Sequence, residues 1–147
     1  MITRLGHIAL RARDIEATAG FYRDVLGMKE AFRMYNLPGE QLGSVHIYVA
    51  PSQFIEIFPN GAEEYAPTPQ TIGYSHLCFE VDDAAGTLEE LRKRGAPIDT
   101  ELKLGFSRCI QFWTHDPDGN RIEFMELPPD CLQTAANKRY SEESVRK

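Results

Sequence analysis

The sequence predicts an α+β fold made of two tandem modules, each with the element order β-α-β-β-β. The first observation is an internal repeat, because "RLGHIAL", a helical stretch and "QFIEIF" are followed, in the same order, by "GYSHLCF", a second helical stretch and "NRIEFM". The second is size and composition: 147 residues with 42% apolar content are enough for a sizeable core. The modules are expected at about residues 4–59 and 73–127.

Each module opens with a strand that leads into a helix. In the first module Asp14 is a candidate N-cap, apolar residues follow at helical spacing, and Gly27 ends the helix. In the second module Asp82 or Asp83 begins a helix that Gly95 closes. The same strand and helix order at both starts supports the repeat.

Three strands are expected after each helix. They are placed at 28–35, 44–50 and 53–58 in the first module, and at 97–103, 108–114 and 121–127 in the second. The turn motif "DPDGN" separates the last two. One domain is therefore expected over residues 1–127, and residues 128–147 form a C-terminal tail that is either a short helix or a frayed end.

Composition excludes several classes of partner. No apolar run approaches the roughly 18 residues of a membrane span, and the first residues lack the features of a signal peptide, so no membrane contact and a cytoplasmic location are expected. The net charge of -6, with no basic run longer than "RKR", argues against nucleic acid. The three cysteines, Cys78, Cys109 and Cys131, are odd in number and widely spaced, which favours free thiols over a disulfide framework.

Four residues suited to metal binding occupy matching places in the two modules. Glu56 lies among apolar residues in "QFIEIF", where a buried carboxylate costs several kcal/mol unless something pairs with it. Glu123 matches it in the last strand of the second module, and His7 and His76 match in the first strands. Two imidazoles and two carboxylates suit a divalent first-row metal. A pseudo-twofold relation between the modules would let the four side chains converge.

A simpler interpretation exists for each of these residues alone. A strand histidine is usually half-buried with a hydrogen bond, and a strand glutamate usually faces solvent, but the repeat of all four favours a metal site. His46 could line a pocket with Tyr48 on the same strand face, or belong equally well to the core or the surface. His115 precedes the "DPDGN" turn and is expected to be exposed.

The sequence resembles the vicinal oxygen chelate superfamily, which includes glyoxalase I, the extradiol dioxygenases and the bleomycin resistance proteins. The resemblance covers about residues 4–127 and rests on "GHIAL", "FYRDVLGM", "IEIF", "SHLCFEV" and "DPDGNRIEFME". It implies that the paired βαβββ modules form a half-open barrel around a metal, and that the protein is a homodimer. Within the superfamily, the ligand set of glyoxalase I matches His7, Glu56, His76 and Glu123, whereas related epimerases tend to carry Gln at the place of Glu56.

The resemblance to glyoxalase I implies an activity. The enzyme would isomerise a hemithioacetal, or a similar substrate with two adjacent oxygens, through a metal-bound enediolate. Glu123 or Glu56 would move the proton between neighbouring carbons, and the symmetry of the sequence leaves open which. The cofactor would be a divalent transition metal, with Ni, Co, Zn, Mn and Fe all open.

Four further residues are candidates for substrate binding. Arg11 and Asn60 match positions that bacterial glyoxalases use to hold glutathione, and arginine can bind a carboxylate through two hydrogen bonds. Each also has a structural interpretation, as a strand-end charge and a turn residue. The segment "LKLGFSRCIQFW" departs from the part of the family that closes over glutathione, so Lys103 and Arg108 could replace it or accept another substrate. A small molecule is expected, with a glutathione adduct as the first candidate.

Two other functions remain open. The first is an iron-dependent extradiol-type dioxygenase that uses His7, His76 and Glu123 as its three ligands. The second is a metal-free resistance protein that sequesters a drug. The presence of all four ligand residues argues against the second.

Overall fold

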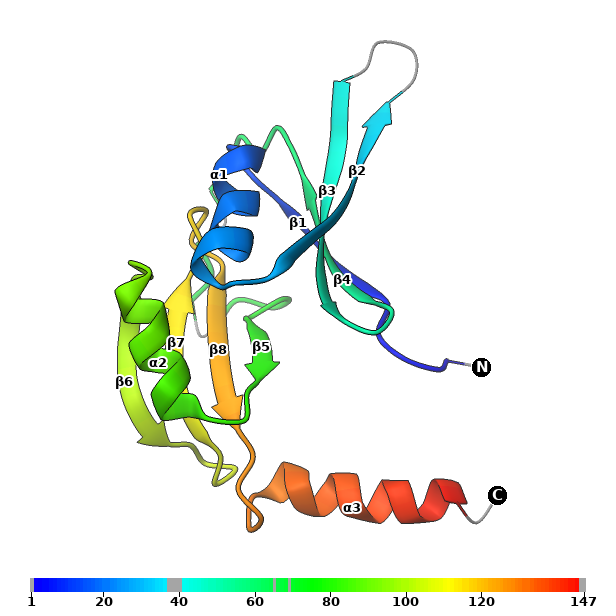
Figure 1. The fold of residues 1–147 in the computed structure, drawn as a ribbon, viewed down its shortest axis with the longest axis vertical. Coiled ribbons are helices and arrows are strands. Elements are labelled where there is room, and N and C mark those ends of the chain that lie inside the picture. Colours follow the sequence, from blue (N-terminus) through cyan, green and yellow to red (C-terminus); the bar gives the residue numbers. More distant parts are fainter. Residues whose placement is uncertain (1, 37–40, 65, 69, 146–147) are drawn as a thin grey trace. The chain divides into compact units, whose positions relative to one another are not determined.

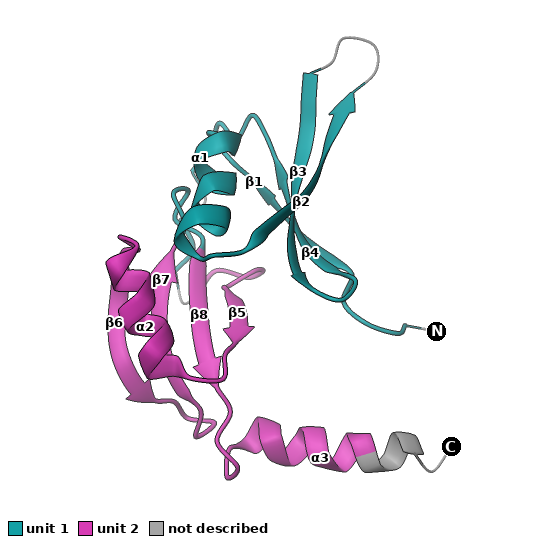
Figure 2. Ribbon diagram, in the orientation of Figure 1, with its two compact units in different colours: residues 1–70, 116–120 teal, residues 71–115, 121–147 magenta. Residues whose placement is uncertain are grey.

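The computed structural model describes residues 2–36, 41–64, 66–68 and 70–145, and places them in two compact units. Unit 1 comprises residues 1–70 and 116–120, and unit 2 comprises residues 71–115 and 121–147 (Figure 2). None of the helices in the described ranges is long and apolar enough to cross a membrane.

Unit 1 contains one four-stranded sheet and the helices that follow its first strand (Figure 1). Its elements are β1 (His7–Arg11), α1 (Ile15–Gly20), the π-helix η1 (Phe21–Val25), β2 (Lys29–Asn36), β3 (Gln41–Ala50) and β4 (Gln53–Phe58). The strand order is β1-β4-β3-β2, with β1 parallel to β4 and the other neighbours antiparallel. This is the first predicted βαβββ module.

Unit 2 repeats the arrangement. Its elements are β5 (Leu77–Glu80), α2 (Ala84–Lys93), β6 (Ile98–Leu104), β7 (Ile110–His115), β8 (Arg121–Glu126) and α3 (Leu132–Val145). The strand order β5-β8-β7-β6 matches that of unit 1, with β5 parallel to β8. The predicted α+β class and its two βαβββ modules are confirmed, and the segment after β8 is a helix rather than a frayed end.

Side-chain capping explains where α1 and α2 begin. Asp14 Oδ1 accepts the backbone N–H groups of Glu16 and Ala17, and Asp83 Oδ1 accepts that of Gly86. The predicted first helix differs in one respect, because it changes from α-helix to the π-helix η1. Five residues are too few for hydrophobic periodicity to distinguish a π-helical turn from an α-helical one.

In the last strand of each module, apolar core side chains lie on one face and the candidate glutamate lies on the other. In β4, Ile55 and Ile57 are buried in the core of unit 1, and alternation puts Glu56 on the opposite face. In β8, Ile122 and Phe124 are buried, and Phe124 stacks on Phe112 of β7. Glu123 therefore lies on the opposite face of its strand, as Glu56 does in unit 1.

The "DPDGN" turn is organised around the carboxylate of Asp116, which is 1% exposed. Asp116 Oδ1 accepts the backbone N–H groups of Asp118 and Asn120, and Oδ2 accepts the side-chain amide of Asn120 and the hydroxyl of Tyr22. Burial raises the pKa of Asp116 above its usual value, although the hydrogen bonds from Asn120 and Asp118 oppose this effect.

Asp116 is expected to lower the stability of the protein as the pH rises above the ordinary pKa of an aspartate. Because the folded state keeps the Asp116 proton to a higher pH than the unfolded state, the free energy of unfolding falls as pH rises through the unfolded pKa toward the folded pKa. When urea unfolding is followed as the pH rises from about 4, near the ordinary pKa of an aspartate, stability should fall less in Asp116→Asn than in the wild type. The exposed Glu63→Gln is the control. Parallel stability curves for Asp116→Asn and the wild type would contradict the prediction.

Candidate functional site

The first candidate pair lies in unit 1, where β1 runs parallel to β4. Ala9 pairs with Glu56 across these strands, and His7 begins β1 two residues earlier. His7 Nε2 is 3.5 Å from Glu56 Oε2, and the Glu56 side chain is 13% exposed. The parallel register thus brings together two of the four predicted metal ligands.

His46 is a third group at this pair, and the sequence did not assign it. It lies directly opposite Glu56 in the antiparallel β3–β4 register, with its Nε2 3.3 Å from Glu56 Oε1 and 3.1 Å from Ser44 Oγ. The ring is buried and stacks on Phe32, with centroids 4.1 Å apart. Each oxygen of Glu56 therefore faces an imidazole, His7 at Oε2 and His46 at Oε1.

Unit 2 contains the matching pair. His76 immediately precedes β5, and its Nε2 is 3.2 Å from Oε2 of Glu123, whose side chain is 12% exposed. Glu123 pairs with Cys78 on β5 and with Trp113 on β7. Trp113 thus occupies the place that His46 holds beside Glu56, and its ring lies against His76 with centroids 4.7 Å apart. The two glutamates have similar histidine partners but different second neighbours.

Cys78 remains a thiol beside Glu123. Burial raises the pKa of Cys78 to about 12, and the negative charge of Glu123 and a hydrogen bond to it contribute to the rise. Besides this thiol, the polar groups at Glu123 are its own carboxylate oxygens and the His76 imidazole.

The chemistry of the two pairs fits a divalent transition metal. Glu56 and Glu123 are largely buried, and within the described ranges neither forms an ion pair with a lysine or arginine. Nitrogen from imidazole and oxygen from carboxylate are suitable ligands for such a metal. In the part of the chain that the structure describes, no three His, Cys, Asp or Glu side chains are already grouped so that they could hold a metal ion. Within each unit, one of the predicted histidines lies beside one of the predicted glutamates.

Arg11 and Asn60, the first two predicted substrate residues, both lie near the end of β4 in unit 1. Arg11 Nη1 donates to the carbonyl of Pro59 at 2.8 Å, and its guanidinium lies 5.6 Å from the ring centroid of Phe58. Asn60 has a φ of 66°, which supports its interpretation as a turn residue. Among the described residues, Pro59 accepts a hydrogen bond from one of the five N–H groups of Arg11.

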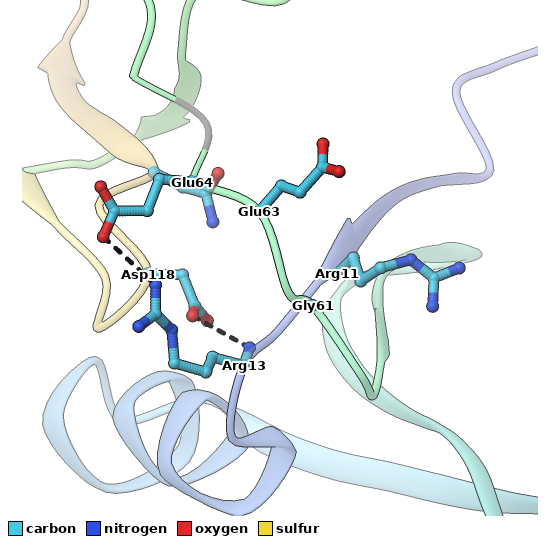
Figure 3. A pocket seen from close by; sticks show the side chains of 7 residues that line it. Arg11, Arg13, Gly61, Glu63, Glu64 and Asp118 are labelled. Carbon is cyan, nitrogen blue, oxygen red and sulfur yellow. Dashed lines mark hydrogen bonds and ion pairs between the residues drawn. The ribbon is translucent and has the colours of Figure 1, made fainter.

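A charged pocket of unit 1 lies next to Arg11 (Figure 3). Arg13 donates from its backbone N–H to Asp118 Oδ1 at 3.0 Å and from Nη2 to Glu64 Oε1 at 3.4 Å. Figure 3 shows the Arg11 side chain pointing away from this group. The described lining residues are Arg11, Arg13, Gly61, Glu63, Glu64, Asp118 and Asn120. They include none of the predicted metal ligands, and the pocket is therefore separate from the His7–Glu56 pair.

Lys103 and Arg108, the other two predicted substrate residues, lie in unit 2. Lys103 is on β6, where it pairs with Gln111 of β7. Arg108 is in the β6–β7 loop, and its Nη2 is 2.5 Å from Asp130 Oδ2, in the segment that leads into α3. The loop that carries Arg108 is therefore tied to the start of the last helix.

Comparisons with known proteins agree with this architecture. The family model of the Glyoxalase/Bleomycin resistance protein/Dioxygenase superfamily matches residues 4–124. The lactoylglutathione lyase of Salmonella typhimurium is 33% identical over 129 residues, which cover 84% of this chain and 92% of that protein. The probable chloroplastic lactoylglutathione lyase of Arabidopsis thaliana is 31% identical over 133 residues, or 86% of this chain, but the match spans only 36% of that protein. The crystal structure of a glyoxalase family protein from Enterococcus faecalis aligns with a TM-score of 0.71 at 24% identity, covering 84% of this chain and 97% of that one.

Proposed function

Because the chain belongs to the Glyoxalase/Bleomycin resistance protein/Dioxygenase superfamily, we propose that it is a metal-dependent, glyoxalase I-like enzyme. The proposed reaction isomerises a hemithioacetal, or a similar substrate with two adjacent oxygens, to a hydroxyacyl thioester or its analogue. The observation that carries the proposal is the pair of largely buried glutamates, each within 3.5 Å of a histidine Nε2 at corresponding places in the two units. A homodimer is the proposed assembly.

His7, Glu56, His76 and Glu123 are the proposed metal ligands. Their nitrogen and oxygen atoms fit a divalent transition metal, and a cation would offset the cost of burying two carboxylates. When bound, the metal would act as a Lewis acid that stabilises negative charge on the two adjacent oxygens of the substrate. The protein's own residues then bind the substrate and move a proton.

Glu123 is the proposed base. Glu56 faces imidazoles at both oxygens, because His7 and His46 lie 3.5 and 3.3 Å away, and it is therefore the better held of the two glutamates. Glu123 faces one imidazole, and its other neighbours are the weakly donating Cys78 thiol and the Trp113 ring. Glu123 would take the proton from a substrate carbon and return it to the neighbouring carbon.

A glutathione adduct is the proposed substrate. Arg11 and Asn60 would bind a carboxylate or peptide group of glutathione at the end of β4, and Lys103 and Arg108 would contribute positive charge from unit 2. The Arg11 guanidinium supports this role, since among the described residues Pro59 accepts a hydrogen bond from one of its five N–H groups.

The hemithioacetal of glutathione and methylglyoxal tests this function. Metal-depleted protein should be inactive and should regain thioester formation when Ni, Co, Mn, Zn or Fe(II) is added, because the metal stabilises the developing charge. Elemental analysis of the purified protein should find a transition metal in stoichiometric amount. A catechol with dioxygen, run in parallel, is the comparison.

Two outcomes would reject the proposal. One is the absence of hemithioacetal turnover with every metal. The other is dioxygen uptake with the catechol, which would favour the three-ligand dioxygenase that uses His7, His76 and Glu123.

A further inference from the structure

Two of the three cysteines meet in unit 2, although 22 positions separate them in the sequence. Cys109 lies at the end of the β6–β7 loop and Cys131 immediately before α3. Their sulfur atoms are 3.2 Å apart, and both residues are fully buried free thiols. Since a disulfide bond is about 2 Å long, the sulfurs need to approach by only about 1 Å to form one.

The surroundings of the two thiols are different. Cys131 Sγ lies at the start of a 14-residue helix and accepts the backbone N–H of Thr134 at 3.4 Å and the thiol of Cys109. Cys109 Sγ accepts the Ser107 hydroxyl and lies 3.1 Å from Gln133 Oε1, which is the alternative acceptor for its single S–H proton. The positive end of a helix and a backbone N–H group stabilise a thiolate. Cys131 is therefore the more nucleophilic sulfur.

The pKa values of the two thiols shift in opposite directions, in agreement with the difference in their surroundings. Burial raises the pKa of the Cys131 thiol, but the hydrogen bonds from Thr134 and Cys109 outweigh burial and lower it below its usual value. Burial raises the pKa of Cys109, and the neighbouring Cys131 raises it further, against the effect of Ser107. Cys131 is thus suited to attack as a thiolate, whereas Cys109 is suited to remain a protonated thiol until the second step.

The pair lies where the β6–β7 loop holds the first turn of α3. Leu132 N–H donates to the Ser107 carbonyl at 3.0 Å, and Arg108 forms an ion pair with Asp130. Beyond this turn the side chain of Tyr140 is exposed, as is that of Leu132 at its start. Met125 and Leu127 pack with the two cysteines in a small apolar cluster, so a peroxide reaches the sulfurs only when the start of α3 opens locally.

We propose that Cys109 and Cys131 are an oxidation site at which a peroxide forms a disulfide, joining the start of α3 to the β6–β7 loop. The Cys131 thiolate attacks one peroxide oxygen, the O–O bond breaks, and the released hydroxide takes up the proton that the Cys131 thiol had lost, so the products are a Cys131 sulfenic acid and water. The Cys109 thiol then attacks that sulfur, the S–O bond breaks, and a second water leaves. Two thiols are oxidised and one peroxide is reduced. The proposal does not depend on the metal site.

A thiol count on the full chain tests the proposal. Hydrogen peroxide is added to the purified protein in small molar excess, and thiols are then counted after denaturation. The number should fall from three to one, because the reaction consumes Cys109 and Cys131 and leaves Cys78, which packs against their cluster, as a free thiol, and dithiothreitol should restore three. The intact mass should fall by about 2 Da, the mass of the two hydrogens removed. Trypsin should then release a linked pair of peptides, residues 109–121 and 122–138.

Matched variants make the result specific. Cys131→Ser and Cys109→Ser should each fail to lose 2 Da, and Cys109→Ser should instead accumulate the sulfenic acid of Cys131, trapped by dimedone. Cys78→Ser should still form the link. The proposal is overturned if the product is a link between two chains, if the link involves Cys78, or if peroxide leaves all three thiols countable. Since no metal or substrate is present, the result is separate from that of the hemithioacetal assay.

Discussion

Replacing Glu123 with Gln is expected to lower kcat by about 10²- to 10⁴-fold, the usual contribution of a general base. A glutamine amide keeps the size of the side chain and an oxygen ligand but cannot accept a proton. The variant should be measured with the hemithioacetal at a saturating concentration of the activating metal, so that weaker metal binding does not lower kcat. KM should change less than kcat, because Glu123 is proposed to act on the reacting carbon rather than to hold the substrate.

Glu56→Gln is the matched comparison for this prediction. It makes the same chemical change at the corresponding position of the other module, where His46 and His7 hold the carboxylate. At saturating metal its kcat should fall much less than that of Glu123→Gln. Glu80→Gln, at an exposed position of β5, should behave as wild type. Equal losses of kcat in Glu56→Gln and Glu123→Gln would show that the assignment of the base to Glu123 is wrong.

The parts of the fold that the sequence predicted are those determined by local signals and by the repeat. Asp14 and Asp83 begin helices because their carboxylates accept backbone N–H groups within three residues, an interaction that depends only on the neighbouring sequence. The βαβββ order follows from the pattern occurring twice. For the last helix, α3, the sequence could not decide between a short helix and a frayed end, because its residues form no apolar stripe and its first turn is held by contacts with the distant β6–β7 loop.

In the candidate site, too, local sequence signals were predictive and contacts between distant segments were not. Alternation within a strand and the match between modules identified Glu56 and Glu123, and the structure places a histidine beside each. His46 could not be assigned, because its position opposite Glu56 depends on the register between β3 and β4. The contact between Cys109 and Cys131 depends on where the segment after β8 docks, and nothing in the spacing of the cysteines indicates it.

Glu56→Gln and His46→Phe are expected to weaken metal binding in a graded way. Losing the charge of a ligand should cost more affinity than losing the group that orients it, and removal of such an outer partner typically costs about 10- to 100-fold. His46→Phe keeps an aromatic ring against Phe32 but removes the Nε2 that faces Glu56 Oε1. We therefore expect an affinity about 10- to 100-fold lower in His46→Phe, and lower still in Glu56→Gln.

Cobalt titration of the metal-free protein measures this effect without substrate, because ligand-field absorption reports both the affinity and the geometry of the bound ion. Tyr48→Phe is the control, since Tyr48 lies two residues further along β3 and the structure gives it no contact with Glu56. His46→Gln, which keeps an N–H donor, should recover part of the lost affinity if His46 acts by holding Glu56. If His46→Phe binds cobalt as tightly as the wild type, His46 is only a core residue, and the argument that Glu56 is the fixed glutamate and Glu123 the base loses its structural support.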